Sequence, residues 1–261
     1  MPDYSVIDQP PVLKLVFYPR KYYTACPENA FDLVVPVDPD ASISCRFYAK
    51  DINLPWILYF HGNGEVVSDY DEIATFYNKL GLNLVVADYR GYGASTGSPT
   101  FTNLIKDAKT LFTAVKNELS LKGFQQNVWI MGRSLGSISA LELAYHHPDK
   151  IMGMIIESGF ACVVRIMKHL GHLPGEGNLP RLVQECLDMV SKIYTPALII
   201  HGREDDIVPI GEAKDLFEHM GTTRKKLVII PDAGHNDILF AGFKQYFGAI
   251  RKFIANHLDN L

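Results

Sequence analysis

The stretch of sequence that decides the fold is Val128-Trp129-Ile130-Met131-Gly132-Arg133-Ser134-Leu135-Gly136-Ser137. Its apolar first half predicts a buried strand, and residues 138–146 predict a helix directly after it. Strand, tight turn and helix are the context of a Gly-x-Ser-x-Gly nucleophile elbow, which holds the serine in a strained conformation at the positive end of the helix. Ser134 is therefore the candidate nucleophile. The alternative interpretation is a serine that caps the helix between two structural glycines.

Length and composition narrow the class of protein. The chain has 261 residues, of which 48% are hydrophobic and 21% are charged, so we expect one domain over residues 1–261 and no disordered chain. The formal net charge is −4 without any Lys/Arg cluster, which argues against a nucleic-acid partner. The sequence shows neither a signal peptide nor an apolar run of the roughly 20 residues that span a bilayer. We therefore expect a soluble, cytoplasmic protein.

Cysteine and glycine patterns argue against a metal or cofactor. The four cysteines are scattered, and we interpret them as buried free thiols in a reducing compartment, with one disulfide left open: Cys26, Cys45, Cys162 and Cys186. The pair His169-x-x-His172 lacks acidic or thiol partners at ligand spacing. Neither a P-loop nor a Gly-x-Gly-x-x-Gly follows any predicted strand. We expect no metal and no cofactor.

The rest of the chain alternates short apolar runs with segments of helical length. Residues 32–37 and 42–49 alternate like an edge hairpin around Asp38-Pro39-Asp40. Six short runs follow that are apolar except for Asn83, at residues 56–60, 83–87, 128–131, 152–156, 197–200 and 227–230. Amphipathic segments at 71–80, 103–119, 211–220 and 237–257 predict helices. The pattern predicts an α/β fold, a mostly parallel doubly wound sheet of about eight strands with an antiparallel edge hairpin.

Two segments fall outside this alternation. Residues 1–30 are rich in proline and aromatics and predict an irregular arm over the domain. Residues from 159 to about 194 predict a small cap between strands 6 and 7, with a helix over 181–190. The cap carries an apolar series that lines an acyl pocket or, as we favour, forms the buried face of a helix: Phe160, Val163, Ile166, Met167, Leu170 and Leu173.

Chemically capable side chains follow the apolar runs, and ligands bind outside the carboxyl ends of parallel strands. A serine nucleophile needs a histidine base and a carboxylate that orients it. In the order Ser, acid, His, the candidates here are Ser134, Asp205 and His235. Asp206 competes with Asp205, which we favour because it lies on the turn directly after its strand.

The other histidines suit structural roles better than His235 does. Four lie on or near predicted helices: His146, His147, His219 and His257. His61 and His201 each begin a His-Gly turn, where a structural hydrogen bond through the ring is expected. His235 instead follows the last strand in a glycine-containing loop, Ala-Gly-His-Asn-Asp.

An oxyanion needs two preorganised N–H donors. Leu135, directly after the nucleophile, is expected to supply one of them. The second is expected from the loop after Phe60, as the N–H of Asn63, with Gly62 as the second choice; an ordinary glycine turn is the alternative. Arg133 fits a structural ion pair better than a substrate ligand.

A second Gly-x-Ser-x-Gly occurs at residues 93–97. No apolar run leads directly into it, and Ser98-Pro99 follows where a helix should begin. Ser95 is therefore interpreted as a loop serine that shapes the wall of the site.

Four motifs together resemble the α/β-hydrolase superfamily over nearly the whole chain: His61-Gly62-Asn63, Asp88-Tyr89-Arg90-Gly91-Tyr92-Gly93-x-Ser95-x-Gly97, Gly132-Arg133-Ser134-Leu135-Gly136 and His201-Gly202-x-x-Asp205-x-x-Val208-Pro209. Phe17-Tyr18-Pro19 before the edge hairpin is similar to the BEM46-like group, which includes α/β-hydrolase domain-containing proteins 13 and 17. Members that remove palmitoyl groups carry a cysteine-rich N-terminus, where this chain has only Cys26, and other members carry a membrane anchor. The resemblance does not carry depalmitoylation or membrane residence to this chain.

The resemblance implies serine-hydrolase chemistry on carboxylesters or acyl thioesters. We expect an acyl-enzyme on Ser134 and a small-molecule or acyl substrate. A serine peptidase or a lyase on the same fold remains an alternative, and so does a non-catalytic protein that binds a ligand. The complete Ser134, Asp205 and His235 set argues against the binder, which has no need of it.

Overall fold

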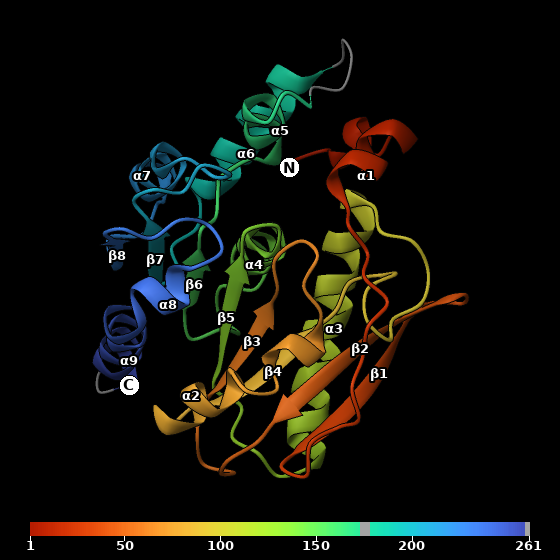
Figure 1. Ribbon diagram of the computed structural model, residues 1–261, viewed down its shortest axis with the longest axis vertical. Helices are drawn as coiled ribbons and strands as arrows, with labels where there is room; N and C mark the ends of the chain where they lie inside the picture. Colours follow the sequence, from red (N-terminus) through yellow and green to blue (C-terminus); the bar gives the residue numbers. More distant parts are fainter. Residues whose placement is uncertain (173–177, 259–261) are drawn as a thin grey trace.

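The computed structural model describes residues 1–172 and 178–258. In this part of the chain eight strands form one sheet in the order β1-β2-β4-β3-β5-β6-β7-β8, with helices on both faces (Figure 1). The strands are β1 (Ala30–Asp38), β2 (Ala41–Tyr48), β3 (Trp56–Phe60), β4 (Asn83–Ala87), β5 (Val128–Arg133), β6 (Met154–Glu157), β7 (Ala197–Gly202) and β8 (Lys225–Ile230). The pairs β1–β2 and β2–β4 are antiparallel and the others are parallel. The predicted fold class is confirmed.

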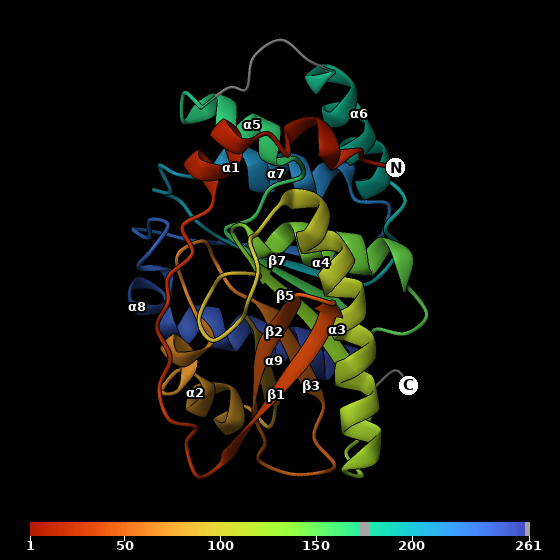
Figure 2. The same ribbon diagram turned by 90° about the vertical axis from the view of Figure 1, so that its right-hand side faces the viewer.

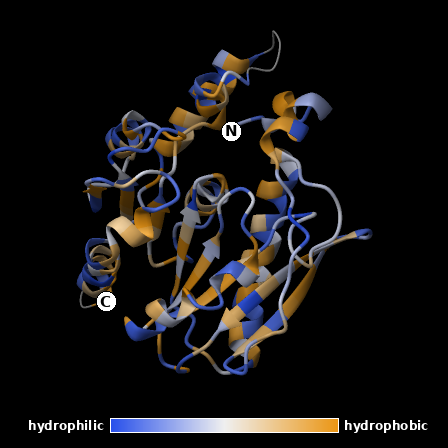
Figure 3. Ribbon diagram, viewed as in Figure 1, coloured by the Kyte–Doolittle hydropathy of each residue, from blue (hydrophilic) through white to orange (hydrophobic). Residues whose placement is uncertain are grey.

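Every residue of strands β3 to β7 is buried, which explains their continuous apolar runs. Alternate side chains of one strand enter different layers. In β3, Trp56, Leu58 and Phe60 pack into one core, whereas Ile57 and Tyr59 pack into the other. Figure 3 shows this concentration of apolar residues in the central strands.

Helices cover both cores. Helices α3 (Phe101–Leu121), α4 (Gly136–His146) and α7 (Ile210–His219) pack on one face, and α2 (Ala74–Lys79) and α9 (Phe243–Leu258) pack on the other. The expected helix over 71–80 is shorter, because a 3-10 turn, η2 (Val67–Tyr70), precedes α2. The expected helix over 237–257 is divided at Gly242 into α8 (Ile238–Ala241) and α9. A Cβ on Gly242 would come within 2.4 Å of the Ile230 side chain, so a larger residue does not fit at the break.

The N-terminal arm differs from the prediction of an irregular segment. It contains a 3-10 turn, η1 (Tyr4–Ile7), and a helix, α1 (Pro10–Val16). Pro10 and Pro11 occupy the first turn of α1, where a missing N–H costs no hydrogen bond. After α1 the chain runs in extended form along the molecule to the start of β1 (Figure 2).

Two helices form the insertion between β6 and β7: α5 (Val163–His169) and α6 (Leu179–Val190). They lie beyond the carboxyl ends of the central strands, as α1 does (Figure 1). Helix α6 begins before the predicted residue 181, with Pro180 in its first turn. Leu173, part of the predicted apolar series, lies outside the described residues. All four cysteines are free, and Cys26 is exposed, contrary to the prediction of burial, whereas the other three are buried.

Candidate active site

The elbow is a strained turn between β5 and α4. Ser134 has a φ of 49°, in the left-handed region that non-glycine residues avoid. The flanking glycines permit close approach instead: a Cβ on Gly136 would lie 2.0 Å from the Phe60 carbonyl oxygen, and one on Gly132 would lie 2.4 Å from the Gly136 oxygen. The turn therefore leaves room for no side chain larger than that of glycine at positions 132 and 136.

Three side chains from separate strand ends form a continuous chain of contacts. His235 Nε2 lies 3.0 Å from Ser134 Oγ, and His235 Nδ1 lies 2.8 Å from Asp205 Oδ2. All three residues are buried, with exposed fractions of 9% for Ser134, 5% for Asp205 and 6% for His235. With the Nδ1 proton donated to Asp205, Nε2 is free to accept the serine proton.

Backbone donors hold Asp205 in place. Its Oδ1 accepts the N–H groups of Ile207 at 3.1 Å and Val208 at 2.7 Å. Burial raises the pKa of the Asp205 carboxyl, but the hydrogen bonds from His235 and Val208 outweigh that effect and bring the pKa below its ordinary value. Asp205 is therefore ionised at neutral pH. Asp206 is exposed, and its carbonyl oxygen lies 3.0 Å from His169 Nε2.

Two amide groups are available for an oxyanion. The N–H groups of Leu135 and Asn63 have no acceptor within the described ranges, and both residues line the cavity beside Ser134. The N–H of Gly62, the second choice, donates to Glu65 Oε2 at 2.7 Å. This bond removes Gly62 from the candidates and favours Asn63.

An ion-pair network lies beneath the elbow. The sequence predicted a structural ion pair for Arg133 but not its partners. The Arg133 guanidinium contacts Glu65 and lies 3.1 Å from Glu157 Oε1. Its Nη2 donates to the His235 carbonyl oxygen at 2.8 Å and to Asn236 Oδ1 at 3.1 Å. The residue before the candidate nucleophile thus holds the loop that carries His235. The position of Glu157 directly after an apolar run was the available signal.

Glu157 is fully buried and fully paired. Besides Arg133, it accepts the hydroxyl groups of Tyr59 at 3.1 Å and Tyr246 at 2.6 Å. Burial raises the pKa of Glu65, but the charge of Arg133, together with the hydrogen bonds from Tyr70 and Gly62, outweighs burial, and the pKa lies below its ordinary value. Both carboxylates, those of Glu65 and Glu157, therefore balance the positive charge of Arg133.

The other serine and histidine candidates for the site have structural hydrogen-bond partners. Ser95 Oγ accepts the Ser44 N–H at 2.9 Å in a buried loop. His201 Nε2 lies 2.7 Å from the Val208 carbonyl oxygen, and burial lowers its pKa, so the ring is neutral. His61 Nδ1 lies 2.8 Å from the Gly62 oxygen.

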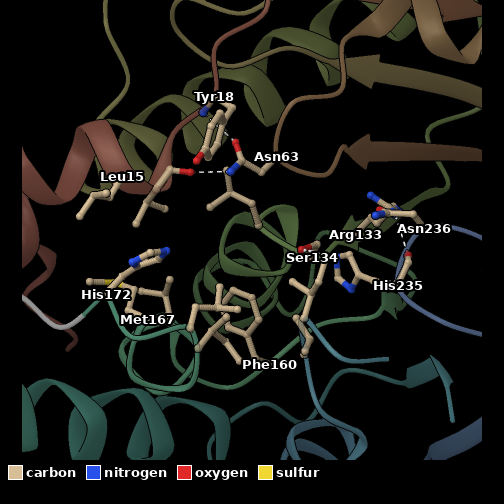
Figure 4. Close-up of a pocket in the computed structure, with 17 residues that line it drawn as sticks. Leu15, Tyr18, Asn63, Arg133, Ser134, Phe160, Met167, His172, His235 and Asn236 are labelled. Atoms are coloured by element: carbon tan, nitrogen blue, oxygen red, sulfur yellow. Dashed lines mark hydrogen bonds between the residues drawn. The ribbon is translucent and has the colours of Figure 1, made fainter. Parts of the chain in front are cut away.

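A cavity of about 300 Å³ opens on Ser134. The predicted cap residues line one side: Phe160, Val163, Ile166, Met167 and Leu170. The arm lines another side with Leu15, Val16 and Tyr18, which the sequence did not indicate. Figure 4 shows Ser134 and His235 at one side of the cavity, with Leu15 and His172 across it. Four of these cap residues also pack in the core, namely Phe160, Val163, Ile166 and Met167.

Comparisons with known proteins place this geometry in a family. Residues 55–173 and 177–240 match the family described as serine aminopeptidase, S33. The α/β-hydrolase domain-containing protein 17B of Homo sapiens is 31% identical over 84% of this chain and 73% of its own length. This chain belongs to the α/β-hydrolases. Within them it falls in the BEM46-like group, because protein bem46 of Schizosaccharomyces pombe is 31% identical over 78% of this chain and 68% of its own length.

Solved structures agree on the fold of this α/β-hydrolase. The Pyrococcus furiosus esterase Pf2001 superposes with a TM-score of 0.74, at 17% identity, over 91% of this chain and 98% of the esterase. Among the described residues no helix is long and apolar enough to cross a membrane. Nor do three or more His, Cys, Asp or Glu side chains gather there into a group that could hold a metal ion.

Proposed function

We propose that this α/β-hydrolase is a serine hydrolase that cleaves carboxylester or acyl-thioester bonds through an acyl-enzyme on Ser134. The observation that carries the proposal is the unbroken contact from Asp205 through His235 to Ser134, which ends at the wall of an apolar cavity. A nucleophile, its base and the orienting carboxylate are the minimum that acyl transfer requires.

The reaction follows from these contacts. Ser134 Oγ attacks the acyl carbonyl carbon while His235 Nε2 takes the hydroxyl proton, and the carbonyl electron pair moves onto oxygen. The Leu135 and Asn63 N–H groups bind the oxyanion. Its collapse expels the leaving group, which takes the proton from His235. A water then repeats the sequence on the acyl-enzyme and releases the acid.

The cavity suits an acyl chain of medium length. Its volume of about 300 Å³ lies at the lower end of the range of small-molecule pockets, which is about 300–1,000 Å³. Its walls are mostly aliphatic and aromatic, as acyl recognition requires. We propose a preferred acyl chain of medium length, between acetyl and palmitoyl.

The family description names an aminopeptidase, whose substrate carries a free ammonium group. Such a group needs a carboxylate in the pocket, and no Asp or Glu is among the described residues that line this cavity. The nearby Glu65 and Glu157 are paired with Arg133. The lining therefore favours an uncharged acyl group over a peptide amino terminus.

The test is hydrolysis of p-nitrophenyl esters from acetate to palmitate, together with labelling by a fluorophosphonate probe. We expect labelling of the wild type, none of Ser134→Ala, and a rate maximum at medium chain length. An octanoyl thioester, followed by thiol release, separates thioesterase from esterase activity. A flat chain-length response would refute the acyl pocket. No turnover and no labelling would favour a non-catalytic binder, and cleavage of peptides alone would favour a peptidase.

We also propose a cytoplasmic location. Its support is the state of the cysteines: all four are free, and three of them are buried thiols. Free thiols are typical of a reducing compartment. Fractionation of cells that express the full chain, with thiol alkylation before lysis, tests the proposal. Recovery in an oxidising compartment would overturn it.

A further inference from the structure

The side chain of Asn63 ties the oxyanion loop to the N-terminal arm. Asn63 Nδ2 donates to the Val16 carbonyl oxygen, and Asn63 Oδ1 accepts the Tyr18 N–H at 3.0 Å. The Tyr92 hydroxyl donates to the same oxygen at 2.7 Å and itself accepts the Tyr18 N–H at 3.0 Å. Figure 4 shows Asn63 facing Tyr18, with its amide engaged on both sides. Both the amide nitrogen and the amide oxygen are therefore bound to fixed partners.

The backbone segment that holds Asn63 also forms a wall of the cavity. Leu15, Val16 and Tyr18 all line it, and Leu15 and Tyr18 remain 46% and 62% exposed. A chain that fills the cavity touches this segment. The residue that supplies the oxyanion donor and the residues that contact the acyl group are thus joined by hydrogen bonds.

We propose that residues 15–18 form a catalytic clamp: they hold the Asn63 N–H in position for the oxyanion while they line the acyl pocket. The inference rests on the proposed function. Asn63 contributes its N–H to the reaction, and its side chain is a positioning group. Oxyanion donors act because they are preorganised, and a displacement of about 1 Å in an active site costs about 100-fold in rate.

The arm is attached on both sides of the clamp by contacts that do not involve Asn63. Asp8 accepts the N–H groups of Phe101 at 2.7 Å and Thr102 at 3.1 Å. Buried Phe17 packs on the Phe101 ring with centroids 5.0 Å apart. Beyond the clamp, the Arg20 carbonyl oxygen accepts the Gly93 N–H at 2.8 Å. The clamp can therefore be loosened without detaching the arm.

The test compares two substitutions at one position. Tyr18→Ala removes the side chain and keeps the N–H that bonds to Asn63, whereas Tyr18→Pro removes both. The residue before it is compatible with proline, because Phe17 has φ −89° and ψ 129°, the extended geometry of a residue that precedes proline. The difference between the two variants isolates the N–H.

The readout is kcat and KM on an acetyl ester, whose acyl group is too short to use the pocket wall, and on an octanoyl ester. We expect Tyr18→Ala to raise KM for the octanoyl ester only. We expect Tyr18→Pro to lower kcat on both esters by about 10- to 100-fold relative to Tyr18→Ala, because the oxyanion donor shifts. A purely structural role of the N–H would change thermal stability and leave kcat of the folded enzyme equal in both variants.

Equal kcat for folded Tyr18→Pro and Tyr18→Ala overturns the clamp. If Tyr18→Pro does not fold, Tyr92→Phe decides, because it removes the hydroxyl that donates to Asn63 Oδ1 and accepts the Tyr18 N–H, and leaves the attachments of the arm at Asp8 and Arg20 intact. A fall in its kcat on the acetyl ester supports the clamp, and an unchanged kcat overturns it. Failure of the proposed function is distinguishable, since the wild type would then neither turn over esters nor react with the fluorophosphonate.

Discussion

The chain contains the same pentapeptide pattern twice, and the two copies have different structures. At residues 132–136 the serine itself has a positive φ, of 49°, and the glycines do not. At residues 93–97 the glycines have positive φ values, 49° at Gly93 and 77° at Gly97, and the serine does not. The left-handed conformation therefore strains the candidate nucleophile in one copy, whereas in the other it falls on the flanking glycines, which adopt it without strain.

The surroundings explain the difference. Ser134 lies between a buried strand and a buried helix, where its N–H donates to the Glu157 carbonyl oxygen at 2.9 Å. Its hydroxyl is left for His235. Ser95 lies in the loop after β4, where its hydroxyl accepts the Ser44 N–H. A hydroxyl that satisfies a buried backbone group is not available for chemistry, so context and not the pentapeptide defines the candidate nucleophile.

The largest expected effect tests this difference directly. Ser134→Ala should lower kcat/KM for a p-nitrophenyl ester by about 10⁴-fold or more, because the nucleophile is lost. Ser95→Ala should leave kcat/KM near the wild-type value but lower the free energy of unfolding by about 1–2 kcal/mol, because the buried Ser44 N–H loses its acceptor. Steady-state kinetics and urea unfolding measure the two quantities. Loss of activity in Ser95→Ala, together with wild-type activity in Ser134→Ala, would reverse the comparison.

The sequence was sufficient for the sheet and for the residues at its carboxyl edge. Strands β3 and β4 begin and end where the predicted runs do, because strands buried on both faces consist mostly of apolar residues. Ser134, Asp205 and His235 meet because parallel strands deliver their ends to one edge. These are consequences of chain order, which a single sequence contains.

Other features depend on contacts between side chains distant in the sequence. The pairing of Arg133 with Glu65 and Glu157 joins three separate segments. The bonds from Asn63 to the arm join residues more than 40 positions apart. No periodicity indicates such contacts. The division of the last helix at Gly242 likewise depends on the Ile230 side chain behind it.

The position between the first glycine and the serine gives the next comparison: it is Arg133 in one copy and Ala94 in the other. Arg133 has a side chain 9% exposed beside the fully buried Glu157, whereas Ala94 is exposed. Arg133→Met should lower the free energy of unfolding by about 3–5 kcal/mol, because it leaves buried carboxylates without a counter-charge. Ala94→Met should change it by less than about 0.5 kcal/mol.

Urea unfolding of both variants tests the prediction, and a second substitution tests its cause. Adding Glu157→Gln to Arg133→Met removes one uncompensated charge and should recover part of the lost stability. Activity should fall in Arg133→Met as well, because the His235 carbonyl oxygen loses its donor. Equal stability of the Arg133 and Ala94 variants would mean that the two positions have the same surroundings.

The last glycine of each copy gives a smaller expected effect. A Cβ on Gly136 meets the Phe60 carbonyl oxygen at 2.0 Å, and backbone cannot move aside as a side chain does. Gly136→Ala should therefore destabilise by about 3 kcal/mol. Gly97→Ala should cost about 1–2 kcal/mol, which is the strain of an alanine in the left-handed region. The nearest neighbour of the added Cβ is a side-chain atom, the Ala41 Cβ at 3.1 Å, and not the backbone. Thermal unfolding of both proteins checks the order, and the reverse order would contradict this account of the glycines.

The smallest expected effect concerns helix α4, which follows the elbow. This effect depends on pH. Helix α4 is buried and carries Glu142 into the interior, with 3% of the residue exposed. Burial raises the pKa of Glu142 to about 7. His146 Nε2 lies 3.3 Å from this carboxyl, but burial lowers the pKa of His146, so it supplies no counter-charge at neutral pH. The copy at residues 93–97 continues into exposed Ser98 and buries no carboxyl in this way.

The sign of the effect follows from the raised pKa. Between the ordinary pKa of 4.5 and the folded value of about 7, the native state keeps a proton that the unfolded chain releases, so stability falls as pH rises through this window. Glu142→Gln does not titrate, and at pH 8 it should be more stable than the wild type by about 2 kcal/mol relative to the difference at pH 5.5. Urea unfolding at both pH values measures this change. Glu118→Gln is the control. Glu118 lies on α3 and pairs with Lys122 just after the helix, and its substitution should change stability by less than about 0.5 kcal/mol. A Glu142→Gln difference that stays constant with pH would show that the elbow helix does not bury an uncompensated carboxyl.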